Sequence, residues 1–554
     1  MPASLWAPTF ATSFATASLG GVARPAISLR TPGFARCTTW IPDGATLALR
    51  VGASAPPGKE KEETTARVRL LRDRMAPVVL ATSKFPSSKS EWSEMRVVVP
   101  STSGNGMLAT LEFAAVTGPD GSRVHFAEPR LTVPATPRVP PPPPVRGVVI
   151  VVASGVSTKS LAAYGGPLAL PTLDALAGES VVFSAHRGSS AHASGNLASA
   201  ITGALPRSHG VTDGDARLPE GVPTLAEIVR RAGIATGFFS AHPGTSAPFG
   251  FARGWDQSAS YAPTESASAK RPFEDAAKFV DAHKDGRFLV VVHARAGHPP
   301  WDLTAEELRS IGPPGYTGPV DPRSAGELLA RPARSTARLS DADRTRAMAL
   351  HTRALLDQDA EFGTLLAAIK AAKRDVDTEI IFTGDVAMDE SSPSPYAEGD
   401  VTDEAVLGLP LVVRRPAVPP ARVATPTNPT DVAASVLGAF GLALPRDFVG
   451  VTFEDARADG SAHEGRVLVA ESEGRFSLRR GSLVLLGSGD RDFRLCDLTL
   501  EPACVTDVRA TYPLAHESMR SAAFDGLGTP EGRHAREPAP IDVATASSLR
   551  AWGR

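Results

Sequence analysis

The segment from Gly188 to Val211 holds the residues best placed to carry chemistry. It reads GSSAHASGNLASAITGALPRSHGV, is rich in Ser, Ala and Gly, and follows a strand-like apolar run at 181–185. It then has the pattern of a helix that ends near Thr202-Gly203. In α/β enzymes a strand–turn–helix unit of this kind presents a nucleophile, because small side chains let substrate approach the backbone and a helix N-terminus favours negative charge. The segment therefore predicts a site that handles anions.

Length and composition narrow the class of protein around this segment. At 554 residues the chain predicts two to four domains. A net charge of -2 argues against a general nucleic-acid binder, which would carry a basic surplus. The 42% hydrophobic fraction is typical of globular proteins, and no apolar run approaches the length of a membrane span. We therefore expect neither a nucleic-acid partner nor a membrane span.

The start of the chain and its cysteines say little about the compartment. The first residues, MPASLWAPTFATSF, lack the basic start and the apolar run of a secretion signal, so the localisation stays unknown from the residues alone. Three cysteines are too few for a disulfide framework. Cys496 and Cys504 flank a DLTLEPA turn and either form a disulfide or remain two buried thiols, whereas Cys37 has no evident partner.

Residues 1–132 have the pattern of a β domain. Short apolar alternations separated by Gly, Pro and Ser turns predict a β-sandwich of the jelly-roll kind. The run SEWSEMRVVVP resembles carbohydrate-binding jelly-roll modules, and a spacer or docking domain is the alternative. The expected strands are at 46–53, 66–73, 95–100, 108–116 and 124–133.

Residues 133–146 form a proline-rich linker, since consecutive prolines adopt extended polyproline II and act as a semi-rigid spacer. Beyond it, residues 147–440 alternate apolar strands with helices, which predicts a doubly wound, mainly parallel sheet. Residues 441–525 have the pattern of a small antiparallel β subdomain, and the Pro- and Ala-rich residues 526–554 predict a poorly ordered tail.

The α/β part places polar residues at the carboxyl ends of its strands. Ser154, His293 and Asp385 each stand where a buried apolar strand ends. In a doubly wound sheet, functional groups gather at this edge. We therefore expect these three side chains to lie close together.

From residue 147 to about 507 the chain resembles a sulfatase of the alkaline phosphatase superfamily. The matching stretches follow one another in the family's order over more than half of the chain, which makes the resemblance specific. It implies an alkaline-phosphatase/sulfatase-like α/β fold with a small C-terminal antiparallel β subdomain, and it favours a periplasmic or extracellular location. The stretches are VVIVVASGVSTKSLAAYGG at 148–166, TG-x-x-P-R-x-H-G at 202–210, HARAGHPPW at 293–301, IIFTGD at 380–385 and LCDLTLEPACVTDV at 495–508.

The resemblance also implies where a metal would bind. Sulfatases hold a divalent cation, usually calcium, between two Asp after the first strand and an Asp with His or Asn after a later strand. Here Ser154 and Gly155 occupy the first pair, and Asp385 is retained but is followed by Val386. Calcium takes about six to eight oxygen ligands, so binding to one carboxylate cannot offset the free energy needed to remove water from the ion. We expect no metal cofactor.

The position of the nucleophile has changed as well. In the family it is a Cys or Ser converted to formylglycine, or a Thr or Ser in relatives that cleave phosphates. Counting back from Thr202-Gly203 puts Ala193 at this position, and alanine has no nucleophilic atom. The neighbouring Ser194 is the alternative, with His298 as its base. The Pro, Ser and Arg that direct formylglycine formation are missing, so Ser194 is not expected to be modified.

Further polar residues match positions near a sulfatase substrate. His293 and His298 either hydrogen-bond an anion or fix the HPPW loop against its strand. Arg207 and His209 either touch substrate or stabilise the turn after the helix, and Asn196 completes the set of binding candidates.

The leading hypothesis is a sulfatase-like pseudoenzyme that binds a sulfated or phosphorylated glycan, or another anionic small molecule, without turnover. One alternative is an active sulfatase- or phosphatase-type hydrolase with relocated catalytic groups. The other is a structural envelope or surface protein that binds through its N-terminal β domain.

Overall fold

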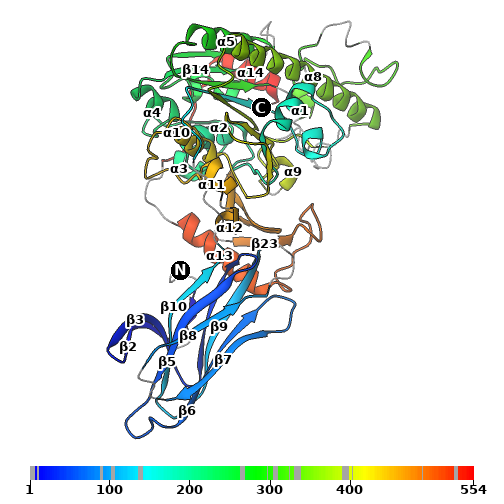
Figure 1. Cartoon of the computed structure of the whole chain (residues 1–554). Helices are drawn as coiled ribbons and strands as arrows, with labels where there is room; N and C mark the ends of the chain where they lie inside the picture. The colour runs from blue at the N-terminus through cyan, green and yellow to red at the C-terminus, as the bar shows by residue number, and fades with distance from the viewer. Residues whose placement is uncertain are drawn as a thin grey trace.

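The structure is a computed structural model of the chain (Figure 1). The structure describes residues 6–8, 12–87, 91–100, 106–134, 141–261, 269–295, 297–303, 308, 310–323, 325–329, 339–389, 398–401, 403–458, 460–489, 491–528 and 534–553. The linker predicted at 133–146 falls partly outside these residues, since 135–140 are not described.

The N-terminal part consists of two five-stranded antiparallel sheets that share one core, which includes Leu29, Leu49, Val68, Leu111 and Phe126. Their strands alternate inward apolar with outward polar residues, as expected for sheets with one wet face. The jelly-roll topology stays a prediction. The first sheet contains β1 (Trp6–Pro8), β4 (Gly33–Ile41), β9 (Met107–Thr117), β6 (Glu63–Leu71) and β7 (Val78–Pro86) in spatial order, and the second contains β2 (Thr12–Leu19), β3 (Val22–Arg30), β10 (Arg123–Thr132), β5 (Thr46–Ser54) and β8 (Ser93–Val98).

The α/β part is built on an eight-stranded, mainly parallel sheet. Strands β11, β14, β15, β16 and β17 are parallel to one another, whereas β18 is antiparallel to both β17 and β12. The order is β15 (Gln257–Ser260), β14 (Ala235–Ser240), β16 (Phe288–Ala294), β11 (Gly147–Ala153), β17 (Thr378–Gly384), β18 (Leu411–Arg414), β12 (Val181–Phe183) and β19 (Ala421–Val423). The doubly wound sheet predicted from the sequence is therefore present.

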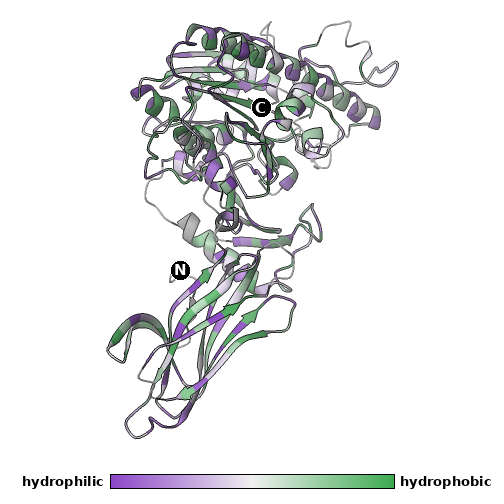
Figure 2. Ribbon diagram, in the orientation of Figure 1, coloured by the Kyte–Doolittle hydropathy of each residue, from purple (hydrophilic) through white to green (hydrophobic). Residues whose placement is uncertain are grey.

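Helices cover both faces of this sheet. Ile150 and Val152 of β11 face one core with α2, α4 and α10, and Val149 and Val151 face the other with α1, α5 and α8. The outer helices carry hydrophilic residues on their exposed sides (Figure 2). The helices of the α/β part are α1 (Pro171–Gly178), α2 (Ala193–Thr202), α3 (Pro206–His209), α4 (Leu225–Arg231), α5 (Arg271–Ala282), α7 (Ala325–Leu329), α8 (Asp341–Ala371), α9 (Glu404–Leu407) and α10 (Thr430–Ala439), with short 3-10 turns η2 (Ala162–Tyr164), η3 (Pro243–Thr245) and η4 (Ala247–Phe249).

A four-stranded antiparallel sheet lies between the α/β part and the N-terminal sheets (Figure 1). It contains β20 (Leu468–Ser472), β21 (Arg475–Arg480), β22 (Leu483–Ser488) and β23 (Arg491–Asp497), preceded by α11 (Phe453–Ala458) and α12 (Gly460–His463). Helix α13 (Pro513–Gly528) packs against β22, and against β4 and β9 of the N-terminal part. Cys496 and Cys504 form a disulfide, with their Cα atoms 5.3 Å apart.

The expectation of a poorly ordered tail at 526–554 is wrong for most of its length. Strand β24 (Glu537–Pro538) pairs with β13 (Ala216–Arg217), and the chain then forms α14 (Val543–Trp552). The Asp542 side chain caps this helix by accepting a hydrogen bond from Thr545 N at 2.7 Å. Leu549 and Trp552 are buried in the α/β part, and burial of these apolar side chains holds the segment in place.

Among the residues that the structure describes, no helix is both long and apolar enough to cross a membrane.

Candidate functional site

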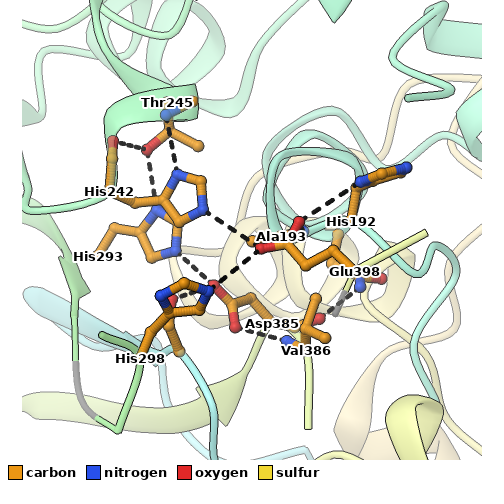
Figure 3. Close-up of polar contacts among 12 residues, drawn as sticks. His192, Ala193, His242, Thr245, His293, His298, Asp385, Val386 and Glu398 are labelled. Carbon is orange, nitrogen blue, oxygen red and sulfur yellow. Dashed lines mark hydrogen bonds and ion pairs between the residues drawn. The ribbon is translucent and has the colours of Figure 1, made fainter. Parts of the chain in front are cut away.

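The ends of three neighbouring strands bring Ser154, His293 and Asp385 together. Strand β11 lies between β16 and β17, with Val152 paired to His293 and to Thr383. His293 Nε2 donates to Asp385 Oδ2 at 2.8 Å, and Ser154 Oγ donates to the same oxygen. The other oxygen, Oδ1, accepts from the backbone N–H of Val386 (Figure 3). The rule that functional groups gather at this edge thus places all three residues in one cluster.

The Asp385 carboxylate is fully buried yet favours the ionised form. Burial alone would raise its pKa, but the hydrogen bond and charge of His293, with the hydrogen bond from Ser154, hold the pKa below its usual value. Both of its oxygens already accept hydrogen bonds from the protein. Asp385 therefore acts as an internal anion rather than as a free ligand.

A second histidine, His242, lies directly after β14 and stacks on His293. The ring centroids are 4.9 Å apart and the planes differ by 4°. Gly244 N donates to His242 Nδ1 at 3.0 Å, so Nε2 of the neutral ring carries the proton and faces Glu398 Oε1 at 3.9 Å. Thr245 Oγ1 lies 3.0 Å from His293 Nδ1. The sequence analysis missed His242, although it follows the same rule as the other residues at the strand ends.

His298 is a neutral histidine held by the chain next to it. Its Nδ1 donates to the carbonyl of Pro299 at 2.6 Å. Burial lowers the pKa of His298 to about 3, so its Nε2 has no proton near neutral pH. That nitrogen lies 3.9 Å from Glu398 Oε1.

Glu398 lies at the start of α2. Its Oε2 accepts from the backbone N–H of Ala193, the first residue of that helix, at 3.3 Å. His192, His242 and His298 all have a ring nitrogen within 4.0 Å of this carboxylate (Figure 3). A helix N-terminus stabilises a negative charge, and here the protein supplies that charge itself. The sequence analysis missed Glu398 because no strand or helix pattern surrounds it.

Ala193, which the sequence predicts at the nucleophile position, is the buried first residue of α2. The alternative, Ser194, is also fully buried, and its Oγ has no hydrogen-bond partner among the described residues. No hydrogen bond to His298 activates it. The pair of Ser194 with His298 as its base is thus not assembled.

The other binding candidates make contacts within the protein. Asn196 Oδ1 accepts from the N–H groups of Ser189 and Ser190 at 2.7 and 3.0 Å, and its Nδ2 donates to the carbonyls of Ser190 and Asp385. This residue ties the turn before α2 to the loop after β17.

Arg207 and His209 lie on α3, at the far end of α2. Arg207 forms an ion pair with Glu471 of β20. His209 Nε2 lies 3.1 Å from Ser199 Oγ, its Nδ1 accepts from Val211 N, and burial lowers its pKa to about 3. His209 thus packs against the middle of α2, and Arg207 joins α3 to β20.

Trp552 of α14 closes the cluster. Its indole stacks on the His298 ring with centroids 3.9 Å apart, and it packs at 4.5 Å against His242. Only 1% of Trp552 is exposed. A side chain from the last described helix thus covers the histidines at the strand ends.

The residues at the expected metal positions do not fit calcium. Ser154 donates its hydroxyl to Asp385, Val386 is apolar, and Gly155 has no side chain. A Cβ at position 155 would lie 2.9 Å from Met388 Sδ and 3.1 Å from His298 N. Within the described part of the chain, no group of three or more His, Cys, Asp or Glu is arranged to hold a metal ion.

The Sulfatase family model matches residues 146–442. No curated protein matches the chain.

Several solved structures share its fold. A putative sulfatase from Bacteroides thetaiotaomicron VPI-5482 is 14% identical with a TM-score of 0.56, over 72% of this chain and 98% of that one. BT4656, in complex with its substrate D-glucosamine-2-N,6-O-disulfate, is 15% identical with a TM-score of 0.56, over 72% and 100%. Ps i-CgsB, in complex with k-i-k-neocarrahexaose, is 14% identical with a TM-score of 0.55, over 74% and 97%.

Proposed function

The chain belongs to the sulfatase family, and we propose that it is a non-catalytic member that binds a sulfated or phosphorylated saccharide. The absence of catalysis is supported above all by the state of Asp385. This carboxylate is buried, accepts hydrogen bonds from His293 and Ser154, and lies beside a helix whose first residue is Ala193. Hydrolysis of an ester needs an attacking atom and a group that stabilises developing negative charge. At this site the attacking atom is missing.

Two further side chains support the absence of turnover. The negative charge of Glu398 at the start of α2 would repel a sulfate or phosphate placed there. Trp552 covers His298 and His242, the nearest groups that could serve as acid or base. An ester would have to displace both side chains before it reached the strand ends.

The ligand class follows from the structures with the same fold. One of them is in complex with a disulfated glucosamine and another with k-i-k-neocarrahexaose. At 14–15% identity these support a ligand class and no particular ligand. An anionic saccharide is therefore the partner proposed for this chain.

Two measurements on the full chain test the absence of catalysis. Calorimetric titration with calcium should give no saturable binding at micromolar concentration. Assays with a generic aryl sulfate and a generic phosphodiester should give rates equal to buffer, and Asp385→Ala should leave them unchanged. Saturable calcium binding, or turnover that Asp385→Ala abolishes, would overturn the proposal.

The alternative of an active hydrolase rests on Ser194 and His298, which form no hydrogen bond. The alternative of a surface protein that binds through its N-terminal sheets stays a prediction, and a glycan array on residues 1–132 alone tests it.

A further inference from the structure

We propose, on the basis of the saccharide-binding function above, that the ligand binds in a cavity between the N-terminal sheets and the rest of the molecule. The cavity measures about 740 Å³, within the range of about 300–1,000 Å³ typical of small-molecule sites. It lies where α12, α13 and β23 meet the ends of the N-terminal strands (Figure 1). Its walls come from all three parts of the chain, so it exists only in the assembled molecule.

Arginines dominate the charged lining, and three of them form ion pairs. Arg187 and Arg479 both pair with Glu404, and Arg466 pairs with Asp431 at 2.7 Å. These ion pairs join the α/β part to β21 and give the cavity a rigid wall. Two further arginines line the cavity.

Arg72 and Arg480 are the two remaining arginines of the cavity lining. Arg72 follows β6, and its Nε and Nη1 are buried without a hydrogen-bond partner in the described part of the chain. Arg480 ends β21 and donates Nε to the carbonyl of Gly465 at 2.8 Å. Burial with no compensating charge lowers the pKa of Arg480 to about 10. Buried guanidinium groups without a carboxylate are costly, and an anionic ligand would offset that cost.

The lining carboxylates are committed elsewhere. Asp73 accepts from the N–H groups of Leu514 and Ala515 at the start of α13, at 3.0 and 2.9 Å. Glu464 accepts from Gly106 N at 2.6 Å, and Asp497 accepts from the Tyr512 hydroxyl at 3.0 Å. These contacts hold the three parts together, so the carboxylates stabilise the cavity without pairing with Arg72 or Arg480.

Aromatic rings supply the second feature that a saccharide needs. Trp40 of β4 and Tyr512 line the cavity, and the Arg480 guanidinium lies 5.8 Å from the Trp40 ring. The Trp40 Nε1 is buried without a partner among the described residues and is a further donor. Flat apolar rings beside guanidinium donors suit a sugar that carries a sulfate or phosphate, because the ring packs on the sugar face while arginine binds the anion.

Calorimetry on the full chain tests this assignment. The probes are a heparin-derived disaccharide with N- and O-sulfates, the same disaccharide without sulfates, and inorganic sulfate. We expect the sulfated disaccharide to bind, and Arg72→Met and Arg480→Met each to weaken it about tenfold, as for loss of one charged hydrogen bond. Arg231→Met, on the exposed face of α4, is the matched control and should leave binding unchanged.

The outcomes separate the site from the function. Binding that both Met variants leave unchanged would overturn the cavity and keep the proposed function, whereas no binding by the parent chain would overturn both. Equal affinity for inorganic sulfate and the disaccharide would overturn the saccharide and leave only an anion site. If a Met variant fails to fold by circular dichroism, Arg72→Lys and Arg480→Lys keep the charge but lose the forked donor geometry, and they should weaken binding to a smaller extent.

Discussion

The indole of Trp552 stacks on the imidazole of His298, with centroids 3.9 Å apart and planes 11° apart. The two residues are more than 250 positions apart in the chain, and each is at least 96% buried. The contact places a side chain of α14 over the strand ends that carry His293 and Asp385. A segment distant in sequence thus determines whether this site is open.

Replacing Trp552 with Ala should destabilise the protein and expose His298. Truncating a buried Trp costs about 3–5 kcal/mol of unfolding free energy, which chemical denaturation would measure. Because His298 is neutral, diethyl pyrocarbonate should modify it in the variant and not in the parent protein, as mass spectrometry would show. His283 of the loop after α5, which is partly exposed, should react in both and serves as the control. Equal protection of His298 in both proteins would contradict a covering role for Trp552.

Introducing a carboxylate at position 155 should not recreate a calcium site. Gly155 has φ +74°, a left-handed conformation that costs other residues about 1–2 kcal/mol, and a new Cβ would also press on Met388 and His298. Gly165→Asp is the matched control, because Gly165 has φ +92° with nothing within 4 Å of a new Cβ. We expect Gly155→Asp to lower the free energy of unfolding by at least about 1 kcal/mol more than Gly165→Asp, since overpacking adds to the conformational cost. Chemical denaturation measures this difference. Equal losses, or calcium binding by Gly155→Asp, would contradict this prediction.

Reducing the disulfide should weaken the C-terminal sheet. Cys496 and Cys504 enclose a short loop with a sequence separation of 8. Closing such a loop lowers the conformational entropy of the unfolded chain, which stabilises the folded protein by about 2.5 kcal/mol. Chemical denaturation with and without a phosphine reductant measures this difference. The variant with both cysteines changed to Ala should not respond to the reductant, because the remaining cysteine, Cys37, forms no disulfide. A response of the double variant would show that the reductant acts elsewhere.

The regular parts of the fold could be predicted because apolar residues recur at different spacings in strands and in helices. Buried runs such as Val148–Val152 indicated parallel strands, and the rule for strand ends then joined Ser154, His293 and Asp385. Strands β2 to β4 gave a weaker signal, since β2 has small and polar residues and β3 contains Pro25. The predicted N-terminal strands therefore correspond to β5, β6 and β8 to β10, and β7 was not predicted either.

The rest of the site depends on long-range contacts that no local pattern shows. Glu398 follows no periodic segment, and its role arises only where the loop meets the start of α2. Trp552 stands in a stretch rich in Ala and Ser, which suggested disorder, yet the Asp542 cap and two buried apolar residues give it a fixed helix. The sequence could therefore predict Ala193 at the nucleophile position but not Glu398 and Trp552, the side chains around it.

The final prediction concerns Glu379 of β17, which lies beside the described end of the linker. Its side chain is buried and lines a cavity together with Pro141, Pro142 and Phe453, and Arg415 Nε is 3.5 Å from its Oε2. Burial raises the pKa of Glu379 to about 7, the charge of Arg415 opposes this rise, and Glu454 adds to it. The ordinary value of 4.5 applies to the unfolded chain.

Because the folded pKa is the higher one, the folded state holds the proton more tightly than the unfolded state between these two values. The stability that Glu379 contributes is fully present below about pH 4.5 and is lost as the pH rises through about 7. Glu379→Gln replaces the titrating carboxyl group with an uncharged amide. We expect the parent protein to lose about 3 kcal/mol relative to the variant between pH 4 and pH 8, measured by chemical denaturation. The buried His186, His209 and His298, whose pKa values are lowered to about 3, act in the opposite direction but are common to both proteins. Parallel stability curves for the two proteins would show that Glu379 stays ionised through its contact with Arg415.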